Sequence, residues 1–404
     1  MNNEYKTKLQ QKTFNTYKDC NRLLIKWATG CGKSKMTIDL LKYTISHIPH
    51  NAVILFLVAE RSHIKNWQEE FKKWQLNEGI KIDILCYNSL SKVSSSHYDV
   101  LVMDEAHHGF SDRRISLLET IKADYIYMLS ATFSDEFLDI AENIFGKFQV
   151  SYVSLKTAIN KSILSDPQIY VVNMELDNTT VNQRIQIGKG DNLPIINWWD
   201  RNKYIYKKKP CIIKCTEYQK NKYFDDSMDY WKRRYEHTHS FIIKNKWVNL
   251  GSQRKKFLGE LKTNHVKILL DKLKKHRLVC FCSSIAQATQ LSESTTISSK
   301  RSSKENQRLI DSFNDKKINS LFTVGMITEG VNLVDTQIGI IIQLDGHLRL
   351  FIQKLGRVLR SNYPVVYIFV YKGTQDEIYL NKALKNINEK SVKYINVTSL
   401  NFMK

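Results

Sequence analysis

The chain has 404 residues, enough for two or three domains that each bury a core of their own. Its first ten residues, MNNEYKTKLQ, are polar and mixed in charge, so we expect no secretory signal peptide. No apolar run approaches the roughly 20 residues of a membrane span. Seven cysteines give no even disulfide framework, which favours a reducing compartment, so we expect a cytoplasmic protein with no membrane partner.

The net charge of +21 is concentrated in the second part of the chain. Residues 1–160 carry 20 basic and 18 acidic side chains, whereas residues 161–270 carry 21 and 11, and residues 271–404 carry 20 and 11. This asymmetry indicates a polyanionic partner, nucleic acid above all, that is contacted mainly by one side of the protein. The alternative is a bias towards Lys, Asn, Ile and Tyr codons, as in AT-rich genomes, which would fit a bacterial or phage-infected cell.

Short apolar runs alternate with helix-like segments over residues 1–160. The runs predict strands at residues 23–25, 53–58, 82–86, 100–103 and 125–129. Residues 33–46 have apolar positions at helical spacing between the first two runs. Strands buried on both faces and separated by helices are typical of a doubly wound parallel sheet.

The sequence WATGCGKS at residues 27–34 follows the first predicted strand. Glycines in such a turn let backbone N–H groups point at phosphate oxygens, at the positive end of the next helix. Trp27 replaces the usual first glycine, and a plain helix-capping turn is the alternative. We interpret the loop as the second half of a phosphate-binding loop for ATP, in which Lys33 reaches the β- and γ-phosphates and the Ser34 hydroxyl ligates Mg²⁺. The candidate nucleotide-binding residues are Thr29, Gly30, Cys31, Gly32, Lys33 and Ser34.

Two carboxylates, Asp104 and Glu105, end the strand predicted in VLVMDEAHH. This position is the carboxyl edge of a parallel sheet, where ligands of open α/β sheets bind. Asp104 would hold Mg²⁺, and Glu105 would polarise the attacking water. An Asp-Glu pair after a strand is more often a solvated helix start, but together with Lys33 the pair indicates an ATP-hydrolysing site.

These motifs resemble those of superfamily 2 DExH/DEAH-box helicases and translocases. The run Asp104-Glu105-Ala106-His107 is similar to their DEAH box, and ATGCGKS is similar to their motif I. Motif III of the family, which links hydrolysis to nucleic-acid binding, resembles Ser130-Ala131-Thr132. The resemblance implies coupling roles for His107, Ser130, Ala131 and Thr132, and makes Gln11 the candidate for the glutamine that reads adenine.

Further stretches resemble particular branches of this superfamily. Residues 64–74, IKNWQEEFKKW, resemble the helix after motif Ia in chromatin-remodeller-type members, and residues 87–92, YNSLSK, lie where that group has motif Ib. Residues 154–170 resemble the inter-lobe junction of restriction-enzyme and phage branch-migration members.

A second α/β series begins near residue 278, with strands predicted at 278–282, 321–324, 339–344 and 365–371. Residues 353–360, QKLGRVLR, match the motif VI pattern Q-x-x-G-R-x-x-R, which implies that Gln353, Arg357 and Arg360 complete the catalytic site from the second lobe. A charge-stabilising arginine contributes roughly 10³–10⁵ to the rate of phosphoryl transfer. Residues 281–284 fall where motif IV does. Residues 328–333 resemble motif V, implying nucleotide contact by Gly330 and coupling by Glu329 and Asn332.

Residues 161–275 differ from both series, being aromatic, basic and mostly helical after Pro210. Trp198, Trp199, Tyr204 and Tyr206 precede the lysines at 207–209, and DYWKRRY follows at 229–235. These aromatic residues either stack on nucleic-acid bases or form the core of the insertion, and the sequence leaves both open.

The insertion and its C-terminal end contain two further groups of residues with metal-binding or catalytic side chains. Cys211, Cys215, His237 and His239 fit no standard zinc spacing, and CIIKC is explained equally well by a strand. Glu260 and Lys262 form an E-x-K of nuclease type, but we expect a pair on a helix surface without nuclease activity.

The sequence therefore predicts two RecA-like doubly wound α/β lobes with a basic, mostly helical insertion between them. We expect an ATP-binding lobe at 1–160, a junction and insertion at 161–275, and a C-terminal helicase lobe at 276–404. The predicted function is an ATP- and Mg²⁺-dependent helicase or translocase acting on nucleic acid, DNA more than RNA, for which a monomer suffices. The alternatives are a duplex-remodelling translocase, an RNA helicase, or a catalytically inactive nucleic-acid-binding scaffold.

Overall fold

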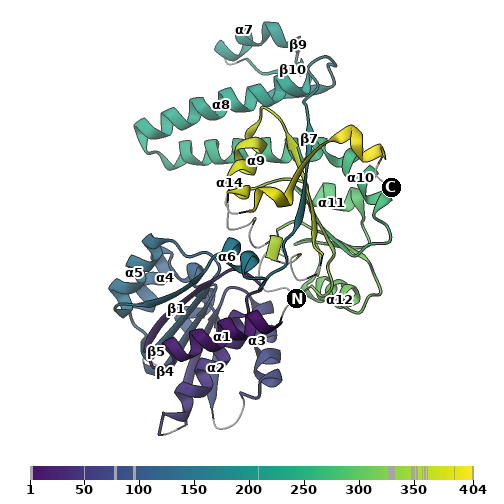
Figure 1. Ribbon diagram of the computed structural model, residues 1–404. Coiled ribbons are helices and arrows are strands. Elements are labelled where there is room, and N and C mark those ends of the chain that lie inside the picture. The colour runs from purple at the N-terminus through teal and green to yellow at the C-terminus, as the bar shows by residue number, and fades with distance from the viewer. Residues whose placement is uncertain are drawn as a thin grey trace.

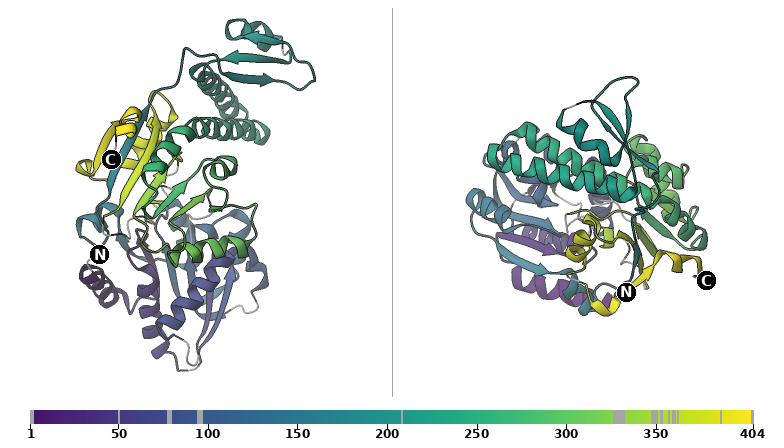
Figure 2. Two further views of the ribbon diagram at one scale, coloured as in Figure 1. Left: turned by 90° about the vertical axis from the view of Figure 1, so that its right-hand side faces the viewer. Right: turned by 90° about the horizontal axis from the view of Figure 1, so that it is seen from above.

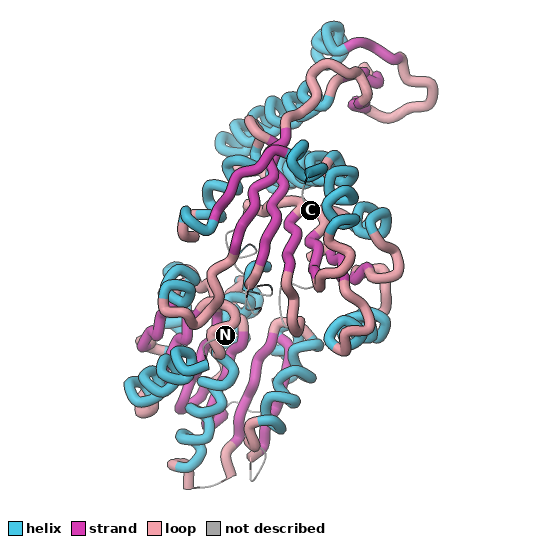
Figure 3. The backbone as a smooth tube through the Cα atoms, turned by 45° about the vertical axis from the view of Figure 1, so that its right-hand side comes forward, coloured by secondary structure: helices cyan, strands magenta, loops and turns pink. Residues whose placement is uncertain are grey.

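The computed structural model describes residues 3–49, 51–76, 80–93, 97–207, 209–325, 333–346, 351, 354–356, 358, 361, 363–385 and 387–402. Two α/β lobes, each built on a parallel sheet, lie one above the other, and helices of the insertion project from the upper lobe (Figure 1). Figure 3 shows the strands of the two large sheets as separate sets with helices around them. The predicted architecture is confirmed.

The first lobe is a six-stranded parallel sheet in the order β3-β2-β4-β5-β1-β6. Its strands are β1 (Arg22–Trp27), β2 (Val53–Val58), β3 (Lys81–Cys86), β4 (His97–Asp104), β5 (Lys122–Ser130) and β6 (Gln149–Val153). Its helices are α1 (Asn3–Tyr17), α2 (Lys33–Ser46), α3 (Arg61–Lys73), α4 (Asp112–Leu118), α5 (Asp135–Phe145) and α6 (Leu155–Asn160). The five predicted strands are all present, and β6 is an additional edge strand.

Alternate residues of the central strands pack on opposite faces of this sheet. Ile54 and Phe56 of β2 join one core cluster with residues of α2 and α3. Leu55 and Leu57 join another with residues of α4 and α5. Because both faces are covered, the strands are apolar throughout, which is the pattern that the sequence carries.

The second lobe is a seven-stranded parallel sheet in the order β12-β13-β11-β14-β15-β7-β16. Its strands are β7 (Gln168–Met174), β11 (Leu278–Phe281), β12 (Thr296–Ile297), β13 (Ser320–Thr323), β14 (Ile338–Ile341), β15 (Val365–Tyr371) and β16 (Val392–Asn396). Its helices include α10 (Thr263–Lys272), α11 (Ile285–Leu291), α12 (Ser303–Asn314) and α14 (Gln375–Leu384). Strand β7 comes from the segment expected to be junction and insertion, yet it pairs with β15 and β16 inside this sheet.

The insertion leaves the second lobe after β7 and returns through α9. It contains a small sheet, in the order β8-β10-β9, and a pair of long antiparallel helices. Its elements are β8 (Gln183–Ile187), β9 (Ile195–Asn197), α7 (Arg201–Tyr206), β10 (Cys211–Cys215), α8 (Glu217–Thr238) and α9 (Phe241–Leu261). Figure 2 shows the small sheet at the end of the molecule away from the first lobe.

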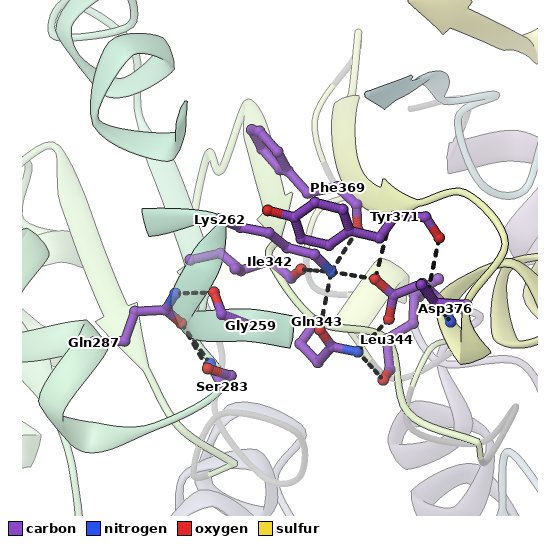
Figure 4. A network of polar contacts seen from close by, with 11 residues as sticks. Gly259, Lys262, Ser283, Gln287, Ile342, Gln343, Leu344, Phe369, Tyr371 and Asp376 are labelled. Carbon is purple, nitrogen blue, oxygen red and sulfur yellow. Dashed lines mark hydrogen bonds and ion pairs between the residues drawn. The ribbon is translucent and has the colours of Figure 1, made fainter. Parts of the chain in front are cut away.

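A buried ion pair fixes the base of α9 to the second lobe (Figure 4). Lys262 and Asp376 are fully buried, and Lys262 Nζ lies 2.6 Å from Asp376 Oδ2. The same amine donates to the carbonyl oxygens of Ile342 and Phe369 and to Gln343 Oε1, at 2.9–3.0 Å. The prediction of a surface pair at Glu260 and Lys262 is therefore wrong for the lysine, because its charge is matched by Asp376, far away in the sequence.

Among the described residues, no helix is both long enough and apolar enough to cross a membrane.

Candidate nucleotide site between the lobes

The loop between β1 and α2 has the backbone of a phosphate cradle. Gly30 and Gly32 have φ values of 94° and 89°, which side-chain-bearing residues rarely adopt. A Cβ atom on Gly32 would collide with Gln10 and would lie 2.6 Å from Lys6 Cε. Lys33 begins α2, and its Nζ donates to the carbonyl of Trp27 at 3.0 Å. Positive φ at both glycines and close packing around Gly32 explain why the loop requires glycine.

A cleft of about 1150 Å³ opens in front of this loop. Its walls come from the loop, from α1, from α3 and from the end of β4. The predicted residues that line it are Thr29, Gly30, Gly32, Lys33, Ser34, Asp104 and Glu105. The structure thus brings the phosphate loop and the two carboxylates to one cavity, as their order in the sheet requires.

The Asp104 carboxylate at the end of β4 is held on both of its oxygens. Oδ1 accepts the backbone N–H of Glu105 at 3.0 Å, and Oδ2 accepts the indole N–H of Trp67 at 2.8 Å. The Tyr87 hydroxyl donates to the Asp104 carbonyl at 2.9 Å. Burial, reinforced by Asp104 and Glu105, raises the pKa of Tyr87 well above its usual value, so this hydroxyl keeps its proton.

The residues expected to couple hydrolysis to binding also lie together. His107 is buried, with Nδ1 3.2 Å from Ser130 Oγ and 3.6 Å from Glu105 Oε2. Ser130 Oγ donates to the carbonyl of Thr132 at 2.9 Å and accepts its N–H at 3.2 Å, bending the chain around Ala131. A close contact from Glu105 to His107, followed by hydrogen bonds from His107 through Ser130 to Thr132, therefore connects the carboxylate end of the cleft with the loop after β5.

Cys31 is fully buried in the phosphate loop. Burial raises the pKa of its thiol to about 11, although Lys33 and Lys6 act in the opposite direction. The side chain therefore remains a thiol at neutral pH and serves the packing of the loop, with any phosphate contact made by its backbone.

The residues present fit a magnesium nucleotide. Backbone N–H groups of a glycine turn at the start of α2 suit phosphate oxygens, and the Ser34 hydroxyl with the Asp104 carboxylate gives the oxygen ligands that Mg²⁺ prefers. The buried hydroxyl of Thr29 has no hydrogen-bond partner among the described residues. Thr29 is thus an unsatisfied polar group at the cleft wall, available to a ligand.

The second lobe reaches this loop through Gly356. A Cβ atom on Gly356 would lie 2.6 Å from Thr29 Cβ, and Gly30 faces Leu164 on the other side. Gly356 belongs to the QKLGRVLR motif, so this motif meets the phosphate loop at the boundary between the lobes. The predicted residues Gln353, Arg357, Arg360, Glu329, Gly330 and Asn332 lie outside the described residues.

The structure adds residues that sequence reasoning missed. One of them is Gln10, whose amide donates to the carbonyl of Gly32 at 3.1 Å. The predicted Gln11 also lines the cleft, but its amide donates to Asn15. Trp67 lies within the stretch that resembles the helix after motif Ia, but no sequence signal pairs it with Asp104. Asp345 forms ion pairs with Lys255 of α9 at 2.6 Å and with Lys354, beside Gly356, at 2.9 Å.

The cysteines and histidines of the insertion lie far apart. Cys211–Cys215 is strand β10, with both cysteines buried. His237 lies in the last turn of α8, which starts just after β10 and spans 22 residues, so about 30 Å separates it from Cys215. These four residues therefore do not converge on a zinc site.

The aromatic residues of the insertion divide between core and surface. Trp198 is buried in the core of the small sheet, and the Arg201 guanidinium lies 3.8 Å from its ring centre. Trp199, its neighbour, is 81% exposed. In the helix pair, Tyr235 and Trp247 stack on each other across α8 and α9. The core interpretation therefore holds for Trp198, whereas base stacking by exposed residues such as Trp199 stays a prediction.

Two family models match the chain over the regions that build this site. Residues 2–135 match the res subunit of type III restriction enzymes, and residues 261–362 match the helicase conserved C-terminal domain. Together they cover more than half of the chain; the first covers the residues that line the cleft, and the second covers Gly356, which packs on Thr29. The chain belongs to superfamily 2 of the helicases.

Solved structures share the fold over nearly the whole chain. S. cerevisiae Dbp5 bound to RNA and ADP BeF3 matches with a TM-score of 0.62 and 12% identity, covering 97% of this chain and 90% of Dbp5. The Pyrococcus furiosus Hef helicase domain matches with a TM-score of 0.50 and 14% identity, covering 93% and 97%. The type ISP restriction-modification enzyme LlaBIII bound to DNA matches with a TM-score of 0.54 and 12% identity, covering 97% of this chain and 31% of that enzyme. A comparison with curated proteins finds no match.

Proposed function

We propose that this protein is a nucleic-acid-stimulated ATPase that moves along or unwinds DNA. The observation that carries the proposal is one cleft in which Lys33 and Ser34 face Asp104 and Glu105, while Gly356 of the second lobe packs on Thr29. A nucleotide held there would lie next to the contact between Gly356 and Thr29, so its hydrolysis could change how the lobes sit against each other.

Each residue of the first lobe has a role that its position supports. The backbone of Thr29 to Ser34 would bind the phosphates, with Lys33 on the β- and γ-phosphates. Ser34 and Asp104 would hold Mg²⁺, and bound Mg²⁺ would supply positive charge that offsets the charge of the transferred phosphoryl group. Glu105 would orient the attacking water and accept its proton.

The second lobe would complete the site. We propose that Gln353, Arg357 and Arg360 face the nucleotide, with the arginines stabilising developing negative charge. The packing of Gly356, which precedes Arg357, against Thr29 supports this assignment. Glu329, Gly330 and Asn332 would transmit the nucleotide state to the nucleic acid, as the His107–Ser130 contact would in the first lobe.

The insertion would add a surface for the nucleic acid. Residues 229–250, all of them described, form the outer half of the α8–α9 pair and include no buried residue. They carry five basic and two acidic side chains, and Tyr230, Phe241 and Ile242 are 54–74% exposed. Exposed rings beside cations suit bases and phosphates, with stacking worth about 1–3 kcal/mol per base.

DNA is favoured over RNA because the first lobe matches a restriction-enzyme family and because LlaBIII, of similar fold, is bound to DNA. RNA is the second candidate, since Dbp5, also of similar fold, is bound to RNA.

The test is steady-state ATP hydrolysis without polymer and with single-stranded DNA, duplex DNA or RNA. We expect stimulation by DNA, which the Lys33→Ala variant abolishes. Stimulation by RNA alone would replace DNA by RNA as the substrate. Hydrolysis that no polymer stimulates, or that survives Lys33→Ala, would contradict the proposal.

A further inference from the structure

Helix α3 forms one wall of the cleft and presents Trp67 to it. Trp67 is 4% exposed, and its ring packs between Phe56 of β2 and Phe71 of the same helix, with ring centres 4.5 Å and 5.7 Å away. The indole is therefore locked by packing on both sides. Its only polar atom, Nε1, points at the Asp104 carboxylate, 2.8 Å from Oδ2.

This hydrogen bond prevents the Asp104 carboxylate from rotating about its last side-chain torsion. Since Oδ1 already accepts the Glu105 N–H, the carboxylate could still turn about its last torsion unless Oδ2 were also held. The indole N–H holds it and, being a donor only, cannot compete for a cation. Each carboxylate oxygen keeps lone pairs for a further partner, so the group remains able to bind a metal.

We propose that Trp67 is a positioning residue for Mg²⁺, setting the orientation of the Asp104 carboxylate from α3. The inference rests on the proposed function, because it assumes that Asp104 binds the nucleotide's metal. Groups that hydrogen-bond to metal ligands typically change metal affinity about 10–100-fold when they are removed. Trp67 would thus act through Asp104 without touching the nucleotide.

The chain provides a matched control about two turns further along, at the end of the same helix. Trp74, which caps α3, also donates its indole N–H to a carboxylate, Glu70 Oε2, at the same 2.8 Å. Trp67→Phe and Trp74→Phe each remove one indole–carboxylate bond and keep an aromatic ring, but only Trp67 contacts Asp104.

The experiment measures the affinity of each protein for a fluorescent ATP analogue, once with Mg²⁺ and once with EDTA. For Trp67→Phe we expect the affinity gain due to Mg²⁺ to fall about 10–100-fold, with binding in EDTA unchanged. Trp74→Phe should keep the wild-type affinity gain from Mg²⁺, because Trp74 lines the cleft but bonds to Glu70 and not to Asp104. Manganese titration of the ADP complex, followed by electron paramagnetic resonance, should give the same weakening of the metal.

A double-mutant cycle tests whether Trp67 acts on Mg²⁺ binding through Asp104. If Trp67 acts through Asp104, then adding Trp67→Phe to Asp104→Asn should cause no further loss of the Mg²⁺ effect. Additive losses, an equal loss in EDTA, or an unchanged Mg²⁺ effect in Trp67→Phe would overturn the role of Trp67. A wild-type protein that binds no nucleotide would overturn the proposed function itself, which is a distinct result.

Discussion

Glu105 adopts a left-handed backbone conformation, with φ 46° and ψ 54°, although it carries a full side chain. Such a conformation costs roughly 1–2 kcal/mol for a residue other than glycine, and is found at sites where the surroundings enforce it. Its N–H is held by Asp104, and its carboxylate lies 3.6 Å from His107 Nδ1. With this conformation Glu105 lines the cleft, where we propose that its carboxylate orients the attacking water.

For Glu105→Gln we expect a fall of about 10²–10⁴ in kcat, because the amide keeps the shape of the carboxylate but cannot accept the proton. Nucleotide affinity should stay within a few-fold of the wild type, since phosphate binding is assigned to Lys33 and the loop. Stimulated hydrolysis and analogue binding, measured side by side, test this. Hydrolysis near the wild-type rate would rule out Glu105 as the base.

Lys262 gives a stability prediction. Replacing it by Met leaves Asp376 charged and fully buried, which should lower the free energy of unfolding by about 3–5 kcal/mol. Lys274→Met, which breaks the exposed pair with Asp271, is the control and should have little effect. Urea unfolding measures both, and adding Asp376→Asn to Lys262→Met should restore part of the loss. If the urea midpoint of Lys262→Met equalled that of the wild type, the buried pair would not contribute to the stability of the fold.

At the scale of elements, α9 is joined to the motif VI segment through Asp345. The Asp345 carboxylate forms ion pairs with Lys255 on α9 and with Lys354. Lys354 lies two residues before Gly356 in the motif VI segment. Lys262 and Asp376 fix the base of the same helix. The insertion helix and the part of the second lobe that meets the phosphate loop are therefore tied together by buried or half-buried charges.

The stability that the ion pairs of Asp345 with Lys255 and Lys354 contribute depends on pH. Burial opposes its ionisation, but Lys354 and Lys255 outweigh burial and lower its pKa to about 2. Because this pKa lies below the unfolded value of about 3.9, the ion pairs add stability that is complete above about pH 4 and is lost towards pH 2.

Asp345→Asn should accordingly reduce the free energy of unfolding by about 2 kcal/mol at pH 7, and by progressively less as the pH falls below about 4. Urea midpoints of wild type and variant at a series of pH values measure the difference. Asp315→Asn, which breaks an exposed pair with Lys317, is the matched control and should leave the midpoint unchanged at each pH. A difference that does not shrink in acid would assign the effect to packing.

The elements also show which parts of the fold and the site can be predicted from the sequence. The phosphate loop and the Asp104-Glu105 pair were predictable because each is a run of adjacent residues after a strand buried on both faces. Strand β6 was missed because it is an edge strand with only two buried residues, so its pattern resembles a loop.

The contacts missed are those that join distant parts of the chain. Lys262 was expected at a surface because its partner Asp376 lies 114 residues away. The Trp67–Asp104 bond and the link from Lys255 through Asp345 to Lys354 likewise depend on packing between elements. Short motifs therefore predict the chemistry of the cleft, whereas the residues that orient and connect it require the tertiary structure.

For the whole molecule, the excess charge lies in residues 161–404 and the ATP-binding residues lie mainly in a near-neutral first lobe. If this basic part neutralises about six to ten phosphates, affinity for DNA should fall roughly 10³–10⁵-fold between 50 and 200 mM salt. Fluorescence anisotropy of a labelled oligonucleotide measures this. An affinity independent of salt would contradict the electrostatic role of the second half of the chain.

The central claim is that hydrolysis between the lobes drives movement along a nucleic acid. The most direct measurement is the ATP-dependent displacement of streptavidin from the biotinylated end of whichever polymer stimulates hydrolysis, compared between wild type and Glu105→Gln. We expect displacement by the wild type with ATP, and none with a non-hydrolysable analogue or with Glu105→Gln. Stimulated hydrolysis without displacement on either end of the polymer would contradict it, leaving an ATPase that responds to nucleic acid but does not move.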